Sequence, residues 1–414
     1  MLWTRRLTLL TTQAMIFLVL AEVAALACHF YDTGTLFYKH RREYPVFGET
    51  ERGELSADAL HPYFGPIHRV GVRGRTNAIG FDSPYDYPFD RTSPRQYIIG
   101  IFGGSVGWYF CDRAVPRMVA DLRAAPELAG RDIVTLCFAH EGYKQPQQLL
   151  VLAYFLSLGQ QFDLVLNLDG FNEAALGASN NDRGRDISMP SPLHLDPIIN
   201  VIDRSTLTTR ATYSLAAIGH YKERLNALSG RVRSTHSAFL GFAYGQYYEY
   251  TRHQYEAEIV RFAQVSASPA TNASMIQLTP PVHQRDEGRL YTDIAAEWES
   301  ASLLMHDMLQ ARDVRYVHVL QPNQYSSHHL FGTDEARVAV NPASPFKAAA
   351  ERGYPALRDA GTRLAKRLAF FDATTLFDSV REPVYEDDCC HYNQRGNDLI
   401  GAFVAARVRD VLRP

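Results

Sequence analysis

Two kinds of hydrophobic pattern alternate along most of the chain. Amphipathic stretches such as residues 114–125 and 146–158 repeat apolar positions every three or four residues, as a helix with one buried face does. Strands that are apolar on both faces and alternate with such helices predict a parallel sheet covered on two sides. We therefore expect an α/β fold with a doubly wound, five-stranded parallel sheet, of flavodoxin-like order 2-1-3-4-5. The expected strands are the short, mostly apolar runs at residues 97–102, 132–139, 163–170, 315–323 and 369–374, of which the first is continuous.

Two regions do not follow this alternation. Residues 31–95 are rich in Pro, Gly, Tyr and Asp and have no helical period, which predicts a turn-rich lead into the domain. Residues 174–310 lie between the third and fourth apolar runs and contain long, aromatic-rich stretches of helical character. We expect this block to be an inserted helical cap within a domain that covers residues 96–414.

The N-terminus carries a separate apolar segment behind Arg5 and Arg6. Residues 1–30 are long and apolar enough for a signal anchor, and the small residues at 25–27 also fit the cleavage site of a signal peptide. An interfacial helix and lipidation of Cys28 are further alternatives. The segment therefore predicts either attachment to a membrane or secretion.

Basic residues on the two sides of this segment favour opposite orientations. Arg5 and Arg6 favour a cytoplasmic N-terminus, whereas Lys39, Arg41 and Arg42 follow the apolar run and oppose it. We favour export. The expected location is the inner membrane, with one span and the following domain in the periplasm or at the cell surface, or secretion if the segment is cleaved.

Composition narrows the possible partners. With 414 residues, of which 46% are hydrophobic, the chain is able to form a large core. A formal net charge of −3 and scattered Lys and Arg give no basic surface for a phosphate backbone, so no nucleic-acid partner is expected. Oligomeric state is left open by the sequence.

The five cysteines have neither CxxC spacing nor the pattern of a metal site. We expect no metal and no organic cofactor. In an oxidising compartment Cys111 could pair with Cys389 or Cys390, and unpaired, buried thiols are an equal alternative.

Candidate catalytic residues directly follow the apolar runs, whose carboxyl ends meet at one edge of a parallel sheet. Ser105 follows two glycines after the first run, a position that suits a helix cap, a phosphate-binding loop or a nucleophile. Gly142 follows the second run and Asn172 the third, where a backbone N–H and a carboxamide can donate to an oxyanion. Asp388 and His391, before the last helix, are spaced so that a carboxylate can orient an imidazole that takes the serine proton.

In combination these residues resemble the motifs of the SGNH (GDSL-like) hydrolase superfamily. The resemblance covers residues from about 96 to 173 and from about 314 to 412. It implies the SGNH hydrolase fold and a serine esterase without a cofactor. The matching positions are Ser105 for block I, Gly142 for block II, Asn172 for block III, and Asp388 with His391 for block V.

The resemblance also implies a role for each of these residues. Ser105 would be the nucleophile, His391 the general base and then acid, and Asp388 the group that orients His391. The oxyanion hole would be formed by the backbone N–H groups of Ser105 and Gly142 and by the side chain of Asn172.

Two residues depart from the family pattern. Gly104 stands where block I usually has Asp, and Glu173 stands where block III usually has Asp after the Asn. Neither change removes a group with an assigned chemical role, and both indicate an outlying branch. The sequence GGSVG also fits the G-x-S-x-G elbow of α/β-hydrolases, but that fold needs several strands before the elbow, and a single convincing run precedes Ser105.

We expect a serine esterase that removes acetyl or other short acyl groups from a small molecule or glycan, or from a lipid, at the cell surface. The chain is similar to membrane-anchored bacterial members of the superfamily that are associated with surface polysaccharides. Two alternatives stay open: a cell-surface O-acyltransferase that uses the same triad, and a non-catalytic assembly or binding protein on the same fold.

Overall fold

A computed structural model describes most of the chain in two compact units. One unit comprises Met1–Ser56 and Asn200–Ile276, and the other comprises Ala57–Ile199 and Gln277–Pro414. Arg41 and Arg42, which bear on the predicted orientation, lie outside the described residues, as do parts of the predicted turn-rich lead. The described residues are 2–39, 44, 58–70, 75–202, 208–266 and 283–413.

The larger unit is built on a five-stranded parallel sheet in the order β4-β3-β5-β6-β7. In chain order this is 2-1-3-4-5, so the predicted flavodoxin-like α/β fold is confirmed. Every residue of β5 is buried, as expected for a central strand that is covered on both faces. The strands are β3 (Gln96–Gly103), β4 (Asp132–Cys137), β5 (Leu164–Asp169), β6 (Arg315–Leu320) and β7 (Ala369–Asp372).

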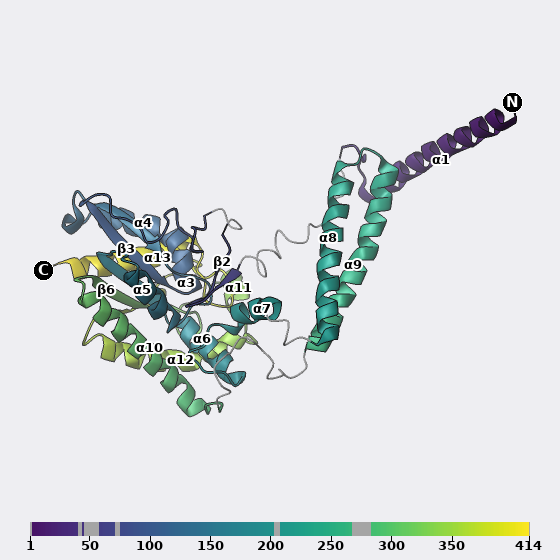
Figure 1. Cartoon of the computed structure of the whole chain (residues 1–414). Coiled ribbons are helices and arrows are strands. Elements are labelled where there is room, and N and C mark those ends of the chain that lie inside the picture. The colour runs from purple at the N-terminus through teal and green to yellow at the C-terminus, as the bar shows by residue number, and fades with distance from the viewer. Residues whose placement is uncertain are drawn as a thin grey trace. The chain divides into compact units, whose positions relative to one another are not determined.

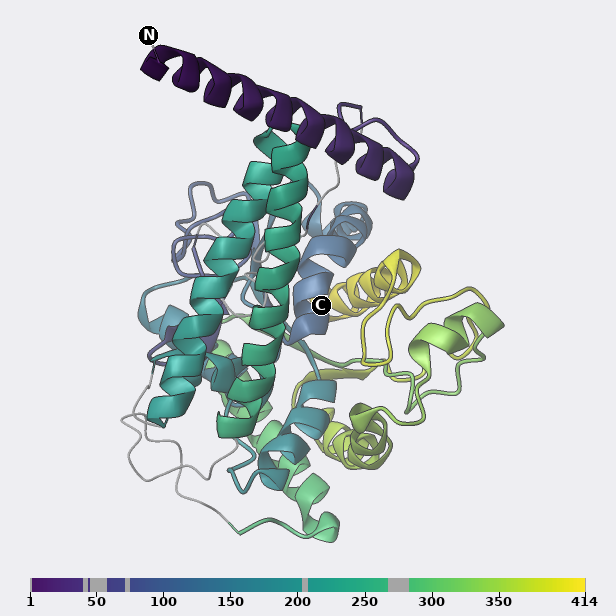
Figure 2. The ribbon, with the colours of Figure 1, turned by 90° about the vertical axis from the view of Figure 1, so that its right-hand side faces the viewer.

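Helices cover both faces of this sheet (Figure 1). Helices α4 and α13 pack against each other on one face, and α5, α6, α10 and α12 lie on the other (Figures 1 and 2). Short α3 (Ser105–Tyr109) and the π-helical turn η1 (Phe110–Ala114) lead into α4, and the 3-10 turn η2 (Pro126–Leu128) follows it. The remaining helices are α4 (Val115–Arg123), α5 (Gln147–Ser157), α6 (Phe171–Asp182), α7 (Pro192–Ile202), α10 (Glu287–Gln310), α11 (Thr333–Ala339), α12 (Pro345–Leu364) and α13 (Gln394–Leu412).

A small antiparallel hairpin precedes the sheet in the same unit. Its strands β1 (Asp58–His61) and β2 (Gly65–His68) pair with each other. Tyr143, from the turn after β4, donates a hydrogen bond of 2.6 Å to the carbonyl oxygen of Pro66 in β2. This contact holds the hairpin close to the carboxyl ends of the parallel strands.

The block predicted as an insertion, residues 174–310, is divided between the two units. Helix α10 belongs to the unit with the sheet, where Trp298 is fully buried and donates to the Asp169 carboxylate at 2.7 Å. His318 in β6 contacts the same carboxylate oxygen at 2.8 Å. The smaller unit takes residues 200–276 of the block, and a cap over the site stays a prediction.

The smaller unit contains α1 (Leu2–Thr33), α8 (Thr209–Ser234) and α9 (Ala238–Ser266), of which α8 and α9 form a hairpin. The Glu22 carboxylate accepts hydrogen bonds from the backbone N–H groups of Ala238 and Phe239 at 2.6 and 3.1 Å, so it caps the N-terminus of α9. Within α1, Leu9–Thr33 is 25 residues long, and a stretch of 18 residues in it has a mean hydropathy of 2.0. By length and composition this segment fits a membrane anchor or a signal sequence.

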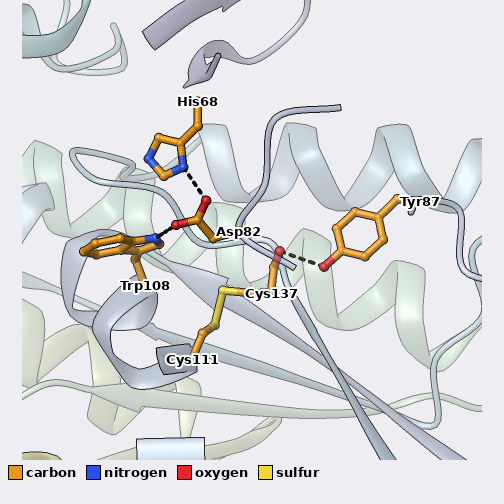
Figure 3. Close-up of a disulfide and its surroundings, with 6 residues drawn as sticks. All are labelled: His68, Asp82, Tyr87, Trp108, Cys111 and Cys137. Atoms are coloured by element: carbon orange, nitrogen blue, oxygen red, sulfur yellow. Dashed lines mark hydrogen bonds and ion pairs between the residues drawn. A yellow bond between two sulfur atoms is a disulfide. The ribbon is translucent and has the colours of Figure 1, made fainter. Parts of the chain in front are cut away.

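A disulfide joins Cys111 in η1 to Cys137 at the end of β4, with their Cα atoms 6.0 Å apart (Figure 3). Neither predicted arrangement of Cys111 is correct, because its partner is not Cys389 or Cys390 and its thiol is not free. No cysteine spacing in the sequence favours this pair. It forms because β3 and β4 are neighbours in the sheet, which brings η1, after β3, close to the end of β4.

Replacing both Cys111 and Cys137 by Ser should lower the free energy of unfolding by roughly 3 kcal/mol, because the bond closes a loop across a separation of 26 residues. Urea unfolding, followed by circular dichroism, measures the change. Cys28→Ser, at an exposed position in α1, is the control and should leave the midpoint unchanged. Equal midpoints for the double variant and the wild type would contradict the pairing.

Candidate active site

Ser105 lies at the carboxyl end of a central strand, as predicted. It begins α3 directly after β3, and Gly104 is the N-cap residue. The amide of Trp108 donates to the carbonyl oxygen of Gly104 at 2.9 Å, so the chain turns into the helix within one residue of the strand. Ser105 retains 9% of its surface exposed, which leaves its hydroxyl at the rim of the sheet.

His391 reaches Ser105 from a distant part of the chain. Its Nε2 lies 2.8 Å from Ser105 Oγ, although 286 residues separate them in sequence. This is the hydrogen-bond distance that a nucleophile and its base require. The two predicted residues are thus brought together at one rim.

The carboxylate that contacts His391 is Asp387 and not the predicted Asp388. Asp387 Oδ2 forms a short hydrogen bond with His391 Nδ1. The side chain of Asp388 instead accepts a hydrogen bond of 2.8 Å from Asn341 Nδ2, away from the imidazole. The carboxylate in contact therefore lies four residues before the histidine, whereas the spacing expected from the resemblance is three. The adjacent aspartates in the sequence were the available signal for this alternative.

The local backbone explains why Asp387 faces inward. Its Oδ1 accepts hydrogen bonds from the backbone N–H groups of Cys389, Cys390 and His391 at 2.9, 3.1 and 3.2 Å. A carboxylate that caps a turn in this way points back over the turn. Its second oxygen is then aimed at the imidazole, while Asp388, one residue later, points outward.

The segment that holds this turn is itself fixed at both ends. Tyr385 and Tyr392 form an antiparallel bridge that closes the loop between them. Buried Tyr392 donates to the carbonyl oxygen of Pro322, just after β6, at 2.6 Å. After the loop, the Asn393 side chain accepts from Gly396 N and caps α13. Asp387 and His391 are therefore attached to the sheet and to a helix rather than to a long free loop.

The environment of Asp387 favours its ionised form. Partial burial opposes ionisation, but the hydrogen bond and charge of His391, with the backbone N–H groups, lower its pKa to about 2. The carboxylate is consequently charged at neutral pH. A charged acceptor on Nδ1 keeps a proton on that nitrogen and leaves Nε2 to accept the proton of the Ser105 hydroxyl.

Two predicted oxyanion residues, Asn172 and Gly142, come together close to Gly104, the residue before Ser105. Asn172, in the first turn of α6, donates from Nδ2 to the carbonyl oxygen of Tyr143 at 2.8 Å. A carboxamide nitrogen carries two hydrogens, so this bond leaves one donor for another acceptor. Gly142 precedes Tyr143 and has φ +76°, and a Cβ atom there would lie 2.3 Å from the His194 ring. The position therefore excludes a side chain and suits glycine.

The two departures from the family pattern have structural explanations. A Cβ atom on residue 104 would lie 2.1 Å from Asn172 Nδ2 and 2.8 Å from the carbonyl oxygen of Tyr143. Gly104 thus leaves the space that Asn172 occupies. The buried carboxylate of Glu173 accepts hydrogen bonds from Gln145 N at 2.9 Å and Gly170 N at 2.8 Å, which ties the second loop to the third.

Gly104→Ala should lower both stability and esterase activity, because the added methyl group collides with Asn172 and with the backbone of residue 143. We expect a loss of about 1–3 kcal/mol in the free energy of unfolding, typical of overpacking a dense site. Urea unfolding and ester hydrolysis measure the two effects. Gly219→Ala, in α8 with open space around it, is the control and should not lose stability. A Gly104→Ala variant as stable and active as the wild type would refute this account.

A cavity of about 630 Å³ opens beside the disulfide. Its lining includes Trp108, Asp82 and Cys111, which are drawn in Figure 3. In the described part of the chain, none of Ser105, Asp387 and His391 lines this cavity. We assign no substrate to it.

No protein-family model matches the sequence, and no curated protein matches it. Solved structures that are similar to the chain include an acylhydrolase and a lipase. A provisionally assigned acylhydrolase from Bacteroides fragilis has a TM-score of 0.34 and 9% identity, over 78% of this chain and 90% of the other. A lipase from a goat rumen metagenome has a TM-score of 0.36 and 13% identity, over 77% and 99%. Similarity of this degree carries no information about activity, so function is inferred from the site.

Proposed function

We propose that the protein is a serine esterase of the SGNH type that cleaves acetyl or other short acyl esters. The observation that carries this proposal is the 2.8 Å contact between Ser105 Oγ and His391 Nε2, with the opposite nitrogen of the imidazole bonded to Asp387. Hydrogen bonds thereby connect the nucleophile to the base and the base to the orienting carboxylate. The group lies outside the carboxyl ends of the strands, where sites of doubly wound sheets are found.

The first half of the reaction follows from these contacts. Ser105 Oγ attacks the acyl carbonyl carbon and passes its proton to His391 Nε2, and the negative charge of Asp387 stabilises the resulting imidazolium. The carbonyl oxygen becomes an oxyanion that accepts hydrogen bonds from the N–H groups of Ser105 and Gly142 and from Asn172 Nδ2. When the intermediate collapses, His391 returns the proton to the leaving alcohol.

The second half regenerates the enzyme. Water takes the place of the alcohol, gives a proton to His391 and attacks the acyl group on Ser105. Collapse of the second intermediate breaks the bond to Ser105 Oγ, which recovers its proton, and releases the carboxylic acid. If a sugar hydroxyl took the place of water, the same steps would make an acyltransferase, and the ratio of the two products distinguishes these outcomes.

We further propose that this reaction takes place outside the cytoplasm. The apolar Leu9–Thr33 segment supports attachment to a membrane or secretion, and the Cys111–Cys137 disulfide is of a kind that persists in oxidising compartments. An ester on a surface carbohydrate or lipid would be accessible there. The chemical class of this acceptor rests on the family resemblance.

A fluorophosphonate probe tests the proposal on the full-length protein. The probe should form a covalent bond to Ser105 Oγ with loss of fluoride, and mass spectrometry of the digested protein should locate the adduct on the peptide that contains Ser105. Heat-denatured protein is the control, because labelling requires the assembled site. An adduct on another residue, or none at all, would refute the assignment of Ser105.

A further inference from the structure

A second group of chemically active side chains lies outside the catalytic group. Asp58 begins β1, His68 ends β2, and His140 with Glu141 occupies the turn after β4. One ligand atom from each of Asp58, His68 and His140 lies within 4.8 Å of the others. Three separate chain segments thus contribute nitrogen and oxygen ligands to one point.

The buried imidazole of His140 is prepared to act as a ligand. Its exposed fraction is 1%, and its Nδ1 lies 2.8 Å from the backbone oxygen of Glu141, which can only accept a hydrogen bond. Nδ1 therefore carries the proton, and Nε2 presents a lone pair. Among the described residues Nε2 has no hydrogen-bond partner, and it faces the Asp58 carboxylate at 3.7 Å.

His68 has a complementary arrangement. Its Nδ1 lies 3.1 Å from Asp82, whose other carboxylate oxygen accepts a hydrogen bond of 2.8 Å from the Trp108 indole (Figure 3). Its Nε2 lies 2.6 Å from Glu141 Oε2. A carboxylate on the far nitrogen of an imidazole is the support that metal-binding histidines usually have.

Three carboxyl groups lie close to the two imidazoles. Three carboxyl groups, those of Asp58, Asp82 and Glu141, surround His68 and His140, and their side chains are only 13%, 17% and 21% exposed. Carboxylates that are largely withdrawn from water require compensating positive charge. A single proton shared between His68 and Glu141 supplies one charge, whereas a divalent cation supplies two.

We propose that Asp58, His68 and His140, with Glu141 as the fourth ligand, bind a divalent transition-metal ion of the Zn²⁺ class. Two imidazoles and two carboxylates match the preferences of this class. In a tetrahedral site with bonds of about 2.0–2.1 Å, ligand atoms lie roughly 3.4 Å apart. The 3.7 Å between His140 Nε2 and Asp58 Oδ1 is close to that value.

Binding requires a defined local change. The proton between His68 Nε2 and Glu141 Oε2 leaves to solvent, and these two atoms separate to admit the ion. His68 Nδ1 keeps its proton and its hydrogen bond to Asp82. The ion then joins both strands of the β1–β2 hairpin to the turn directly before Gly142. The site uses none of Ser105, Asp387 and His391, so it does not depend on the proposed function.

Cobalt titration of the full-length protein in detergent tests this site directly. After chelator treatment and dialysis, added Co²⁺ should give the intense visible absorption of a tetrahedral site, saturate at about one ion per chain, and be displaced by Zn²⁺. His140→Gln and Asp58→Asn each remove one ligand and should weaken binding by on the order of 100-fold or more. Asp82→Asn acts through His68 and should weaken binding by roughly 10- to 100-fold.

Two controls separate this site from others in the chain. His253→Gln, at an exposed histidine of α9, should leave the titration unchanged. The cluster of Cys389, Cys390 and His391 is another possible site for Co²⁺, and replacing both cysteines by Ser should not alter the spectrum if the ion binds as proposed. Circular dichroism establishes that each variant is folded. No tetrahedral spectrum, or one that survives His140→Gln or vanishes with the cysteines, would overturn the proposal.

Discussion

Ser105→Ala is expected to lower kcat/KM for p-nitrophenyl acetate by on the order of 10⁴ to 10⁶. The variant keeps the oxyanion donors and His391 but lacks the oxygen that forms the acyl-enzyme. His391 Nε2 loses the hydroxyl that lies 2.8 Å away and on which it would act as a base. Initial rates over a range of ester concentrations measure the change, together with loss of fluorophosphonate labelling.

The control for this variant is Ser157→Ala, at an exposed residue at the end of α5 whose hydroxyl donates to the Tyr154 carbonyl. It makes the same atomic change far from the rim and should retain full activity. Equal thermal midpoints for the two variants would show that the loss is chemical and not a loss of folding. Substantial turnover by Ser105→Ala would mean that another group is the nucleophile.

The sheet could be predicted because its sequence pattern depends on burial alone. Residues 97–102, 132–139 and 163–170 are mostly apolar, and the corresponding strands are neighbours in the sheet, with the first of them between the other two. A strand that is buried on both faces has few residue types available, whatever its neighbours are. The positions of Ser105 and Asn172 follow from the same logic, since strand ends meet at one edge.

The carboxylate that contacts His391 could not be predicted, because two adjacent aspartates differ only in the direction in which the turn points their side chains. The family spacing favours Asp388, but three backbone N–H groups and the imidazole all face Asp387. This geometry depends on the bridge between Tyr385 and Tyr392 and on the attachment of Tyr392 to the end of β6. Such contacts over long sequence distances have no signature in the local sequence.

Similar reasoning applies to Cys111 and to the histidine cluster. Cys111 pairs with Cys137 because neighbouring strands bring them together, and no motif spacing marks the pair. Asp58 and His68 lie in the turn-rich lead, where the lack of any period hides which side chains face the sheet. The sequence predicts no metal because it contains none of the residue spacings of known metal-binding motifs. Residues from three separate segments have no fixed spacing, so a motif cannot reveal them.

Asp387→Asn should lower kcat/KM by about 10³ to 10⁴, whereas Asp388→Asn should change it by less than about threefold. Both substitutions replace one carboxylate oxygen by an amide nitrogen at nearly constant volume, and they differ by one position. In Asp387→Asn the imidazole loses the charge that stabilises its protonated form, and an amide N–H facing Nδ1 favours the wrong tautomer. The amide oxygen introduced by Asp388→Asn can still accept the hydrogen bond from Asn341.

The pH dependence of this pair of variants separates an electrostatic role from a structural one. The pKa of Asp387 is lowered from 3.8 to about 2, so its carboxylate is ionised at every pH above roughly 4. The stabilisation it contributes to the fold is therefore complete above that pH and is lost as the pH falls through about 2. Loss of this charge makes the protonated imidazole less favourable, so the ratio of wild-type to Asp387→Asn activity should vary between roughly pH 5 and 9, whereas loss of a merely structural contact would leave it constant. Two results would contradict the assignment of Asp387: equal activity of the wild type and Asp387→Asn, or an Asp388→Asn variant that loses as much activity as Asp387→Asn.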